Sequence, residues 1–199
     1  ITNEGISHET YYEMPEPFDR DFKEYSYEEA KLELNKRLRQ SVSRRMLSDV
    51  PIGAFLSGGI DSSIVVALAA EETKHLNTFS LGFKNEAFFD ETSHAEEVAK
   101  KFNTNHKTFT VSKDDMLSEI NNILDYIDEP FADSSAIAVY MLSKKTAGSV
   151  RAALSGDGAD EMFGGYNKHL AHLKASENNL RNKLINNLSF AWKSLPQSR

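Results

Sequence analysis

Short apolar runs alternate along the chain with longer segments of helical periodicity. The runs have the length of buried strands and cover residues 52–56, 76–81, 106–111 and 151–154. Helical patterns cover residues 27–47, 64–70, 92–102, 113–127 and 136–146, and begin again at Tyr166. Strands separated by helices need crossover connections, which indicates a parallel sheet. We therefore predict an α/β fold, a three-layer, doubly wound parallel sheet with helices on both faces.

The ends of the chain lack this alternation. Residues 1–26 are polar, carry Pro15 and Pro17, and read as a linker or arm. Residues 27–175 form the expected core, and residues 176–199 are expected to start a truncated carboxy-terminal helical region. The chain begins at Ile1 and ends without a helix cap or a closing strand. These features predict an excerpt from a longer protein.

Composition narrows the classes of partner. Acidic residues outnumber basic ones by 30 to 23, and no stretch gathers Lys or Arg with aromatic residues, which disfavours a nucleic-acid partner. No apolar run approaches the roughly 20 residues that span a bilayer, so no membrane partner is expected and we take the cytoplasm as the location. The chain has no cysteine, which excludes a disulfide, a thiolate metal site and a cysteine nucleophile within it. The six histidines form no metal-ligand pattern beyond the weak His169-x-x-His172 spacing, and we assign them no functional role.

A first glycine loop, Ser57-Gly58-Gly59-Ile60-Asp61-Ser62-Ser63, lies between a predicted strand and a predicted helix. Gly58 and Gly59 can take positive φ and let a ligand approach the backbone, and the helix start offers free N–H groups to a phosphate. No lysine follows the glycines, so the loop differs from that of nucleotidases that release the γ-phosphate, which points to pyrophosphate. Asp61 would be repelled by phosphates unless a divalent cation, Mg²⁺ by preference, lies between them. The alternative is that Asp61 and Ser62 only cap the helix.

A second glycine loop runs from Leu154 to Tyr166, directly after another predicted strand. It holds four glycines and three carboxylates in eleven residues, which suits a loop around ligand and metal better than a packed core. The alternative, an acidic surface loop that binds calcium, lacks the spacing of the common calcium loop.

The two loops together resemble a known family. Ser57 to Ser63 is similar to the pyrophosphate-binding motif of the ATP pyrophosphatase (PP-loop) superfamily, whose fold is of the adenine nucleotide alpha hydrolase type. Ser155 to Tyr166 resembles a signature of glutamine-hydrolysing asparagine synthetases. Two further stretches agree with that family: residues 79–83 with the helix that follows them, and residues 128–135, Asp-Glu-Pro-Phe-Ala-Asp-Ser-Ser.

The resemblance implies a reaction. Aspartate attacks the α-phosphorus of ATP, pyrophosphate leaves, and ammonia converts the aspartyl-adenylate to asparagine and AMP. It also implies residue roles. Pyrophosphate would be bound by Ser57, Gly58, Gly59, Ser62 and Ser63, and Mg²⁺ by Asp61 and Asp160. Other contacts with ATP would come from Phe55, Leu81, Ser155 and Gly156. Asp157, which stands where many relatives carry Glu, is implied in catalysis with Asp160.

Partners and alternatives follow from the same resemblance. Ammonia is expected from an amino-terminal glutaminase domain that this chain does not contain. The resemblance also implies that a lysine and further helices beyond residue 199 complete the synthetase site, so the 199 residues alone are expected to be inactive. A homodimer is left open. The alternative within enzymes is another adenylating ATP pyrophosphatase, whose acceptor is not aspartate. Examples are a β-lactam synthetase and an amidating enzyme of natural-product or polysaccharide assembly. A non-catalytic nucleotide-binding module is the alternative outside enzymes.

Overall fold

A computed structural model describes residues 5, 8–13, 24–84, 86, 90–129 and 132–177. The chain divides into two compact units, residues 1–40 and 41–199. The helices are α1 (Tyr27–Met46), α2 (Ile60–Glu72), α3 (Thr92–Phe102), α4 (Lys113–Ser118), α5 (Ile120–Tyr126), α6 (Ser135–Thr146), α7 (Ala159–Phe163) and α8 (Asn167–Ser176). The strands are β1 (Ile52–Phe55), β2 (Asn77–Phe83), β3 (Asn105–Val111) and β4 (Ala152–Leu154).

In the first unit, the start of α1 is held by its own side chains. Ser26 and Glu29 exchange hydrogen bonds: the Ser26 backbone N–H donates to Glu29 Oε2 at 2.9 Å, and the Glu29 N–H donates to Ser26 Oγ at 3.4 Å. This reciprocal cap satisfies donors that a helix start leaves free. Of the apolar stripe along α1, Val42 is buried while Tyr27 and Leu34 are exposed.

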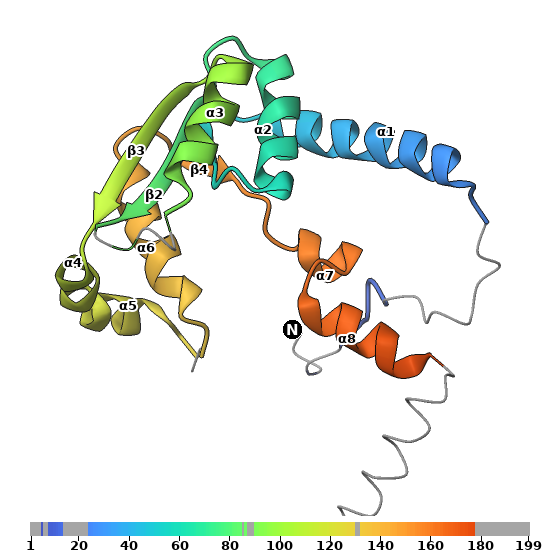
Figure 1. Ribbon diagram of the computed structural model, residues 1–199. Helices are drawn as coiled ribbons and strands as arrows, with labels where there is room; N and C mark the ends of the chain where they lie inside the picture. The colour runs from blue at the N-terminus through green and yellow to red at the C-terminus, as the bar shows by residue number, and fades with distance from the viewer. Residues whose placement is uncertain are drawn as a thin grey trace, which may run out of the picture. The chain divides into compact units, whose positions relative to one another are not determined.

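The second unit is built on a four-stranded parallel sheet with the order β3-β2-β1-β4 (Figure 1). The strands and most helices lie within a few residues of their predicted bounds, because continuous apolar runs suit strands buried on both faces. From β1 the chain proceeds to β2 and β3 on one side, and later returns to β4 on the other side of β1. The tips of β1 and β4 therefore form the switch point at which ligands bind in such sheets.

Helices cover both faces of this sheet, which confirms the predicted fold class. Helices α2 and α3 contact each other and pack on β1, β2 and β3. On the opposite face, the rings of Phe79 and Phe109 stack with centroids 6.3 Å apart. Lys145 of α6 places its ammonium 5.9 Å from the Phe109 ring centre, so α6 lies over this second face. The core between the layers includes Ala54, Leu56, Val66, Leu76, Ala95 and Val111, all at most 1% exposed.

Three predictions about elements were wrong in detail. The single helix predicted over residues 113–127 is two helices, α4 and α5, which meet at Glu119. The helix predicted from residue 64 begins at Ile60. The second glycine loop contains a five-residue helix, α7, where only a loop was predicted.

Candidate nucleotide site

The first glycine loop follows β1 and leads into α2, as predicted. Gly58 has φ +88°, and a Cβ there would lie 2.5 Å from His94 Cβ and 2.6 Å from Ala95 N of α3. Glycine is therefore required at this position both by the backbone angle and by the close packing on α3. Gly59 caps α2 with φ −64°, so of the two glycines that can take positive φ only Gly58 does so here.

The loop is held by two serines. Ser57 Oγ lies 3.0 Å from Ser62 Oγ and accepts a hydrogen bond from the Gly59 N–H at 3.2 Å. Ser62 is 8% exposed and its hydroxyl also contacts the Gly59 carbonyl at 3.3 Å. These contacts fix the loop before any ligand is bound, which lowers the ordering cost of binding.

The second glycine loop follows β4, the strand that pairs with β1, so the two loops leave neighbouring strand tips. Ala54 pairs with Leu154 at the end of that register. A Cβ on Gly156 would lie 2.7 Å from Ser62 N and 2.9 Å from the Asp61 carbonyl carbon. The second loop therefore lies directly against the first turn of α2, and the absence of a side chain at Gly156 permits this approach.

Both loops line one cavity of about 570 Å³, a volume within the usual range of small-molecule sites. Ten predicted site residues line it: Phe55, Ser57, Gly59, Asp61, Ser62, Leu81, Ser155, Gly156, Asp157 and Asp160. Gly58 and Ser63 are not among the lining residues. Gly58 packs on α3 instead, and the buried Ser63 Oγ has no partner among the described residues.

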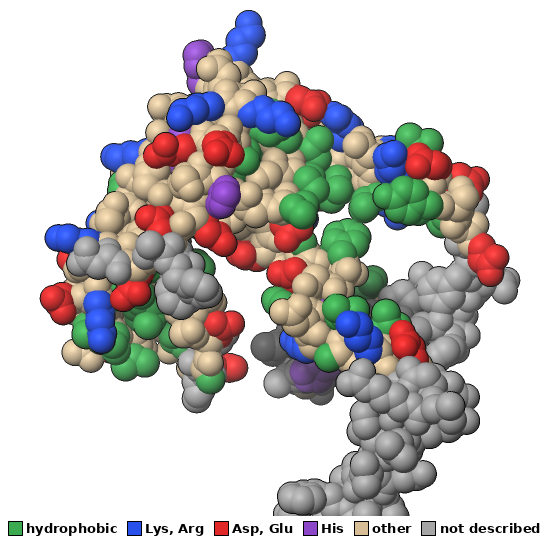
Figure 2. Space-filling model, in the orientation of Figure 1, with side chains coloured by type: hydrophobic (Ala, Val, Ile, Leu, Met, Phe, Trp, Pro, Cys, Tyr) green, Lys and Arg blue, Asp and Glu red, His purple; other side chains and the backbone are tan. Residues whose placement is uncertain are grey.

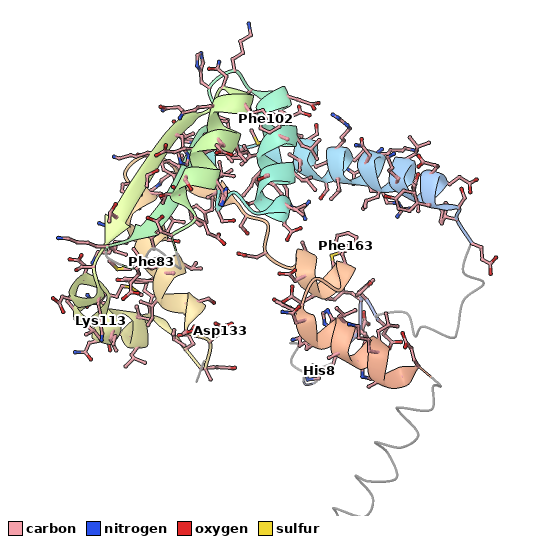
Figure 3. All side chains as sticks on the ribbon, in the orientation of Figure 1. His8, Phe83, Phe102, Lys113, Asp133 and Phe163 are labelled. Atoms are coloured by element: carbon pink, nitrogen blue, oxygen red, sulfur yellow. The ribbon has the colours of Figure 1, made fainter. Side chains whose placement is uncertain are left out.

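The cavity also collects residues that the sequence reading did not assign to the site. These are Leu56, Ser80, Phe83, Glu91, Thr92, Asp133, Ser135, Ala138, Val139, Leu142, Gly158, Glu161 and Tyr166. Figure 3 labels Phe83 at the end of β2 and Asp133 just before α6. Position supplies the missing signal for most of them, because ligands in such sheets bind beyond the carboxyl ends of the strands, whereas Ser80 lies within β2.

Carboxylates dominate the electrostatics of the cavity. Six of them line it, namely Asp61, Glu91, Asp133, Asp157, Asp160 and Glu161, and Figure 2 shows acidic side chains gathered between the α2–α3 layer and α7. The Asp157 carboxylate accepts a hydrogen bond from Ser155 Oγ at 3.0 Å. Glu161 accepts one from the Tyr166 hydroxyl at 2.6 Å, and this bond raises the pKa of Tyr166 to about 12.

Asp61 and Asp160 have the chemistry of a divalent-cation pair. They lie in the first turns of α2 and α7, line the same cavity, and are partly exposed. No hydrogen bond from a described residue reaches either carboxylate. Among the described residues no group of three or more His, Cys, Asp or Glu is arranged to hold a metal. Mg²⁺, however, is commonly bound by one or two carboxylates together with substrate phosphates, so this pair fits it.

Comparison with known proteins identifies the family of the chain. A family model described as "Asparagine synthase" matches residues 33–198. The chain belongs to the asparagine synthase family. It is 42% identical over 152 residues to "Asparagine synthetase [glutamine-hydrolyzing] 1" of Bacillus subtilis, covering 75% of this chain and 24% of that protein. It is also 42% identical over 164 residues to a putative asparagine synthetase of Methanocaldococcus jannaschii, covering 80% of this chain and 30% of that protein.

The chain thus spans about a quarter to a third of the length of these asparagine synthase relatives. Among solved structures, an NH3-dependent NAD synthetase from Campylobacter jejuni matches with a TM-score of 0.45 and 16% identity, covering 68% of this chain and 60% of that one. No helix in the described part of the chain is long and apolar enough to cross a membrane.

Proposed function

We propose that this chain is the nucleotide-binding core of an enzyme that amidates aspartate to asparagine with ATP, through an aspartyl-adenylate. The observation that carries the proposal is the contact of Gly156 with the first turn of α2. Because of this contact, two glycine loops and their carboxylates face one cavity. The membership of the asparagine synthase family supports the same reaction.

In the proposed reaction an aspartate carboxylate oxygen bonds to the α-phosphorus of ATP. The bond from the α-phosphorus to the bridging oxygen breaks, and pyrophosphate leaves with its electron pair. Ammonia then attacks the acyl carbon, AMP leaves, and the proton lost from nitrogen passes to solvent. The protein's task in the first step is to stabilise negative charge that builds on the departing pyrophosphate.

The first loop has the groups for this task. The hydroxyls of Ser57 and Ser62 and the free N–H groups at the start of α2 are already oriented by the contacts within the loop, so little reorganisation is needed as charge moves. Asp61 and Asp160 would hold Mg²⁺, which supplies positive charge between the phosphates and the acidic wall. Phe55 and Leu81 offer apolar surface to the nucleoside.

Asp157 is proposed to act in forming the adenylate. Its carboxylate is held by Ser155 and lines the cavity beside the pyrophosphate loop. Ammonia is proposed to come from a glutaminase domain elsewhere in the complete protein, as the names of the glutamine-hydrolysing relatives suggest.

Product analysis of the complete protein tests this proposal. Incubation with MgATP, aspartate and ammonium should yield AMP, pyrophosphate and asparagine. Asp61→Asn and Asp160→Asn should each lower kcat by about a hundredfold or more, because a preorganised charge in a closed site is worth several kcal/mol. Asp125→Asn, an exposed carboxylate on α5 away from the cavity, is the matched control and should leave kcat unchanged.

Two results would refute or redirect the proposal. ADP as the nucleotide product would refute adenylation altogether. AMP release with another carboxylate, but not with aspartate, would assign the chain to a different amidating or cyclising synthetase. Nucleotide binding without turnover in the complete protein would indicate a binding module.

A further inference from the structure

Polar side chains replace apolar ones on the face of β2 and β3 that α3 covers. Thr78 and Ser80 lie on β2, opposite His106 and Thr108 of β3 in the sheet register. Thr78 is fully buried and Ser80 is 4% exposed. A buried hydroxyl costs free energy unless it is hydrogen-bonded, so a polar ladder at this position needs partners.

The His106 imidazole supplies those partners. Its Nδ1 lies 2.9 Å from Thr78 Oγ1, and its Nε2 lies 3.2 Å from Ser80 Oγ. Thr108 Oγ1 lies 3.3 Å from the same Nε2 and 3.1 Å from Ser80 Oγ. One ring edge and two hydroxyls therefore form a closed triangle, which restricts the rotation of the Ser80 hydroxyl.

Ser80 connects this ladder to the nucleotide cavity. It is one of the residues that line this cavity, and the next residue, Leu81, lines it as well. His106 instead lines a separate groove between α3 and β3, together with Thr108. Ser80 is thus the residue at which the ladder and the cavity meet.

The protonation state of His106 determines which groups in the ladder donate. Burial lowers the pKa of His106, and the charge of Glu96 on α3 partly opposes this shift. Glu96 and Lys100 are the charged residues among those that line the groove with His106. A neutral imidazole has one donor and one acceptor nitrogen. It therefore donates to one of the two β2 hydroxyls and accepts a hydrogen bond from the other.

We propose that His106 is a positioning residue for the nucleotide cavity, and that it acts by orienting the Ser80 hydroxyl toward the nucleoside part of bound ATP. This inference rests on the proposed function, because it takes ATP as the ligand. The role is distinct from that of the glycine loops, which face the phosphates. It also gives a function to a histidine that its sequence pattern left unassigned.

Two amide variants separate orientation of Ser80 from simple filling of space. In His106→Gln the amide can occupy the position of Nε2 and keep the contact with Ser80. In His106→Asn the shorter side chain can occupy the position of Nδ1 and keep the contact with Thr78. The dissociation constant of MgATP is measured for the complete protein, and urea denaturation of each variant reports its stability.

We expect His106→Asn to raise the dissociation constant about fivefold to tenfold, which corresponds to the loss of one hydrogen bond. His106→Gln should change it by less than about twofold. Ser80→Ala should also raise it, and His106→Asn should have no further effect in the Ser80→Ala background, because residues acting through one contact are not additive.

Equal effects of the two amides on MgATP binding would overturn the proposal, as would an undiminished effect of His106→Asn in the Ser80→Ala background. Should neither His106 variant fold, an unchanged dissociation constant in Ser80→Ala would overturn it by itself. Wild-type protein that binds no MgATP would instead refute the proposed function, so the two failures are distinguishable.

Discussion

Gly156 is the glycine at which the second loop meets the backbone of the first turn of α2. A methyl group there would lie 2.7 Å from a backbone nitrogen and 2.9 Å from a backbone carbon of α2, and backbone atoms cannot rotate away. We expect Gly156→Ala to destabilise the fold by about 1–3 kcal/mol, as overpacking does, and to weaken MgATP binding at least tenfold. Urea denaturation and nucleotide titration measure the two effects.

Gly148→Ala is the matched control for this change. Gly148 has no heavy atom within 4 Å of a built Cβ and no positive φ, so its substitution should change stability by no more than about 0.5 kcal/mol. Equal stability and affinity in the two variants would contradict the close approach of the loops.

His106 links the stability of the fold to acid. Its folded-state pKa is lowered, mainly by burial, while the unfolded chain titrates near the usual value of about 6.5. As pH falls through about 6.5 the unfolded chain takes up the proton first, so stability is lost over that range and is fully present above it. We expect the stability of His106→Gln to fall less than that of the parent between pH 8 and pH 5.5, because the contribution of His106 is absent. The midpoints of urea denaturation at each pH measure this difference.

His75 provides the comparison for the acid effect, because it is an exposed histidine just before β2. His75→Gln should leave the dependence of the urea midpoint on pH as it is in the unmodified protein. A loss of stability in acid that is the same with and without His106 would assign the effect to other groups.

Local motifs mark many of the site residues, but not those that folding brings to the site from other segments. Ten of the twelve predicted residues line the cavity, because glycine, serine and aspartate at strand tips mark ligand loops locally. Glu91 and Asp133 come from segments outside the two loops, and only the sheet order brings them to the same cavity. The coordination of Mg²⁺ by Asp61 and Asp160 stays a prediction.

Among the elements, the division between α4 and α5 shows where periodicity alone misleads. Apolar residues continue at helical spacing across residues 113–127, yet the helix ends at Glu119, where ψ is −3°. A tertiary ion pair holds the junction, since Lys144 of α6 donates to both Glu119 carboxylate oxygens at 2.7 and 2.8 Å. No local pattern reports a partner 25 residues away.

The junction of α7 with α8 carries a titration that can be measured. The Tyr166 hydroxyl donates to Glu161, and this bond, followed by desolvation and nearby carboxylates, raises the pKa of Tyr166 to about 12. The bond therefore contributes to stability below pH 10 and loses this contribution as pH rises toward about 12. The difference in phenolate absorbance between the parent and Tyr166→Phe should show a tyrosine titrating near that value.

Replacing the carboxylate tests the cause of the shift. In Glu161→Gln the acceptor loses its charge, so the tyrosine seen in the same difference measurement should titrate closer to its usual pKa of about 10. An identical titration in both backgrounds would show that Glu161 does not hold Tyr166.

At the scale of the whole molecule, alternation of strands and helices was enough to predict a parallel sheet, but not the order of its strands. That order places β1 between β2 and β4, and it sets the two glycine loops side by side. Roughly a hundred residues separate the two loops in sequence, so no local pattern predicts that they are adjacent. The domain boundaries at residues 26 and 175 stay predictions.

The acidic cavity leads to a prediction for the chain taken alone. ATP carries about four negative charges, and six carboxylates line the cavity. These carboxylates repel ATP when no cation is bound with it. We expect the 199-residue chain to bind MgATP weakly and to bind ATP in excess EDTA at least tenfold more weakly still. Fluorescence titration with an ATP analogue, at fixed ionic strength, measures both affinities.

Neutralising one carboxylate at a time distinguishes a carboxylate that binds Mg²⁺ from one that only repels the phosphates of ATP. Glu91→Gln removes a charge without removing a proposed Mg²⁺ ligand, so it should strengthen binding of metal-free ATP and leave the Mg²⁺ requirement in place. Asp61→Asn should instead reduce the gain that Mg²⁺ gives, because it removes a ligand along with the charge. If both substitutions only improve binding, with and without Mg²⁺, then Asp61 repels phosphate and holds no cation.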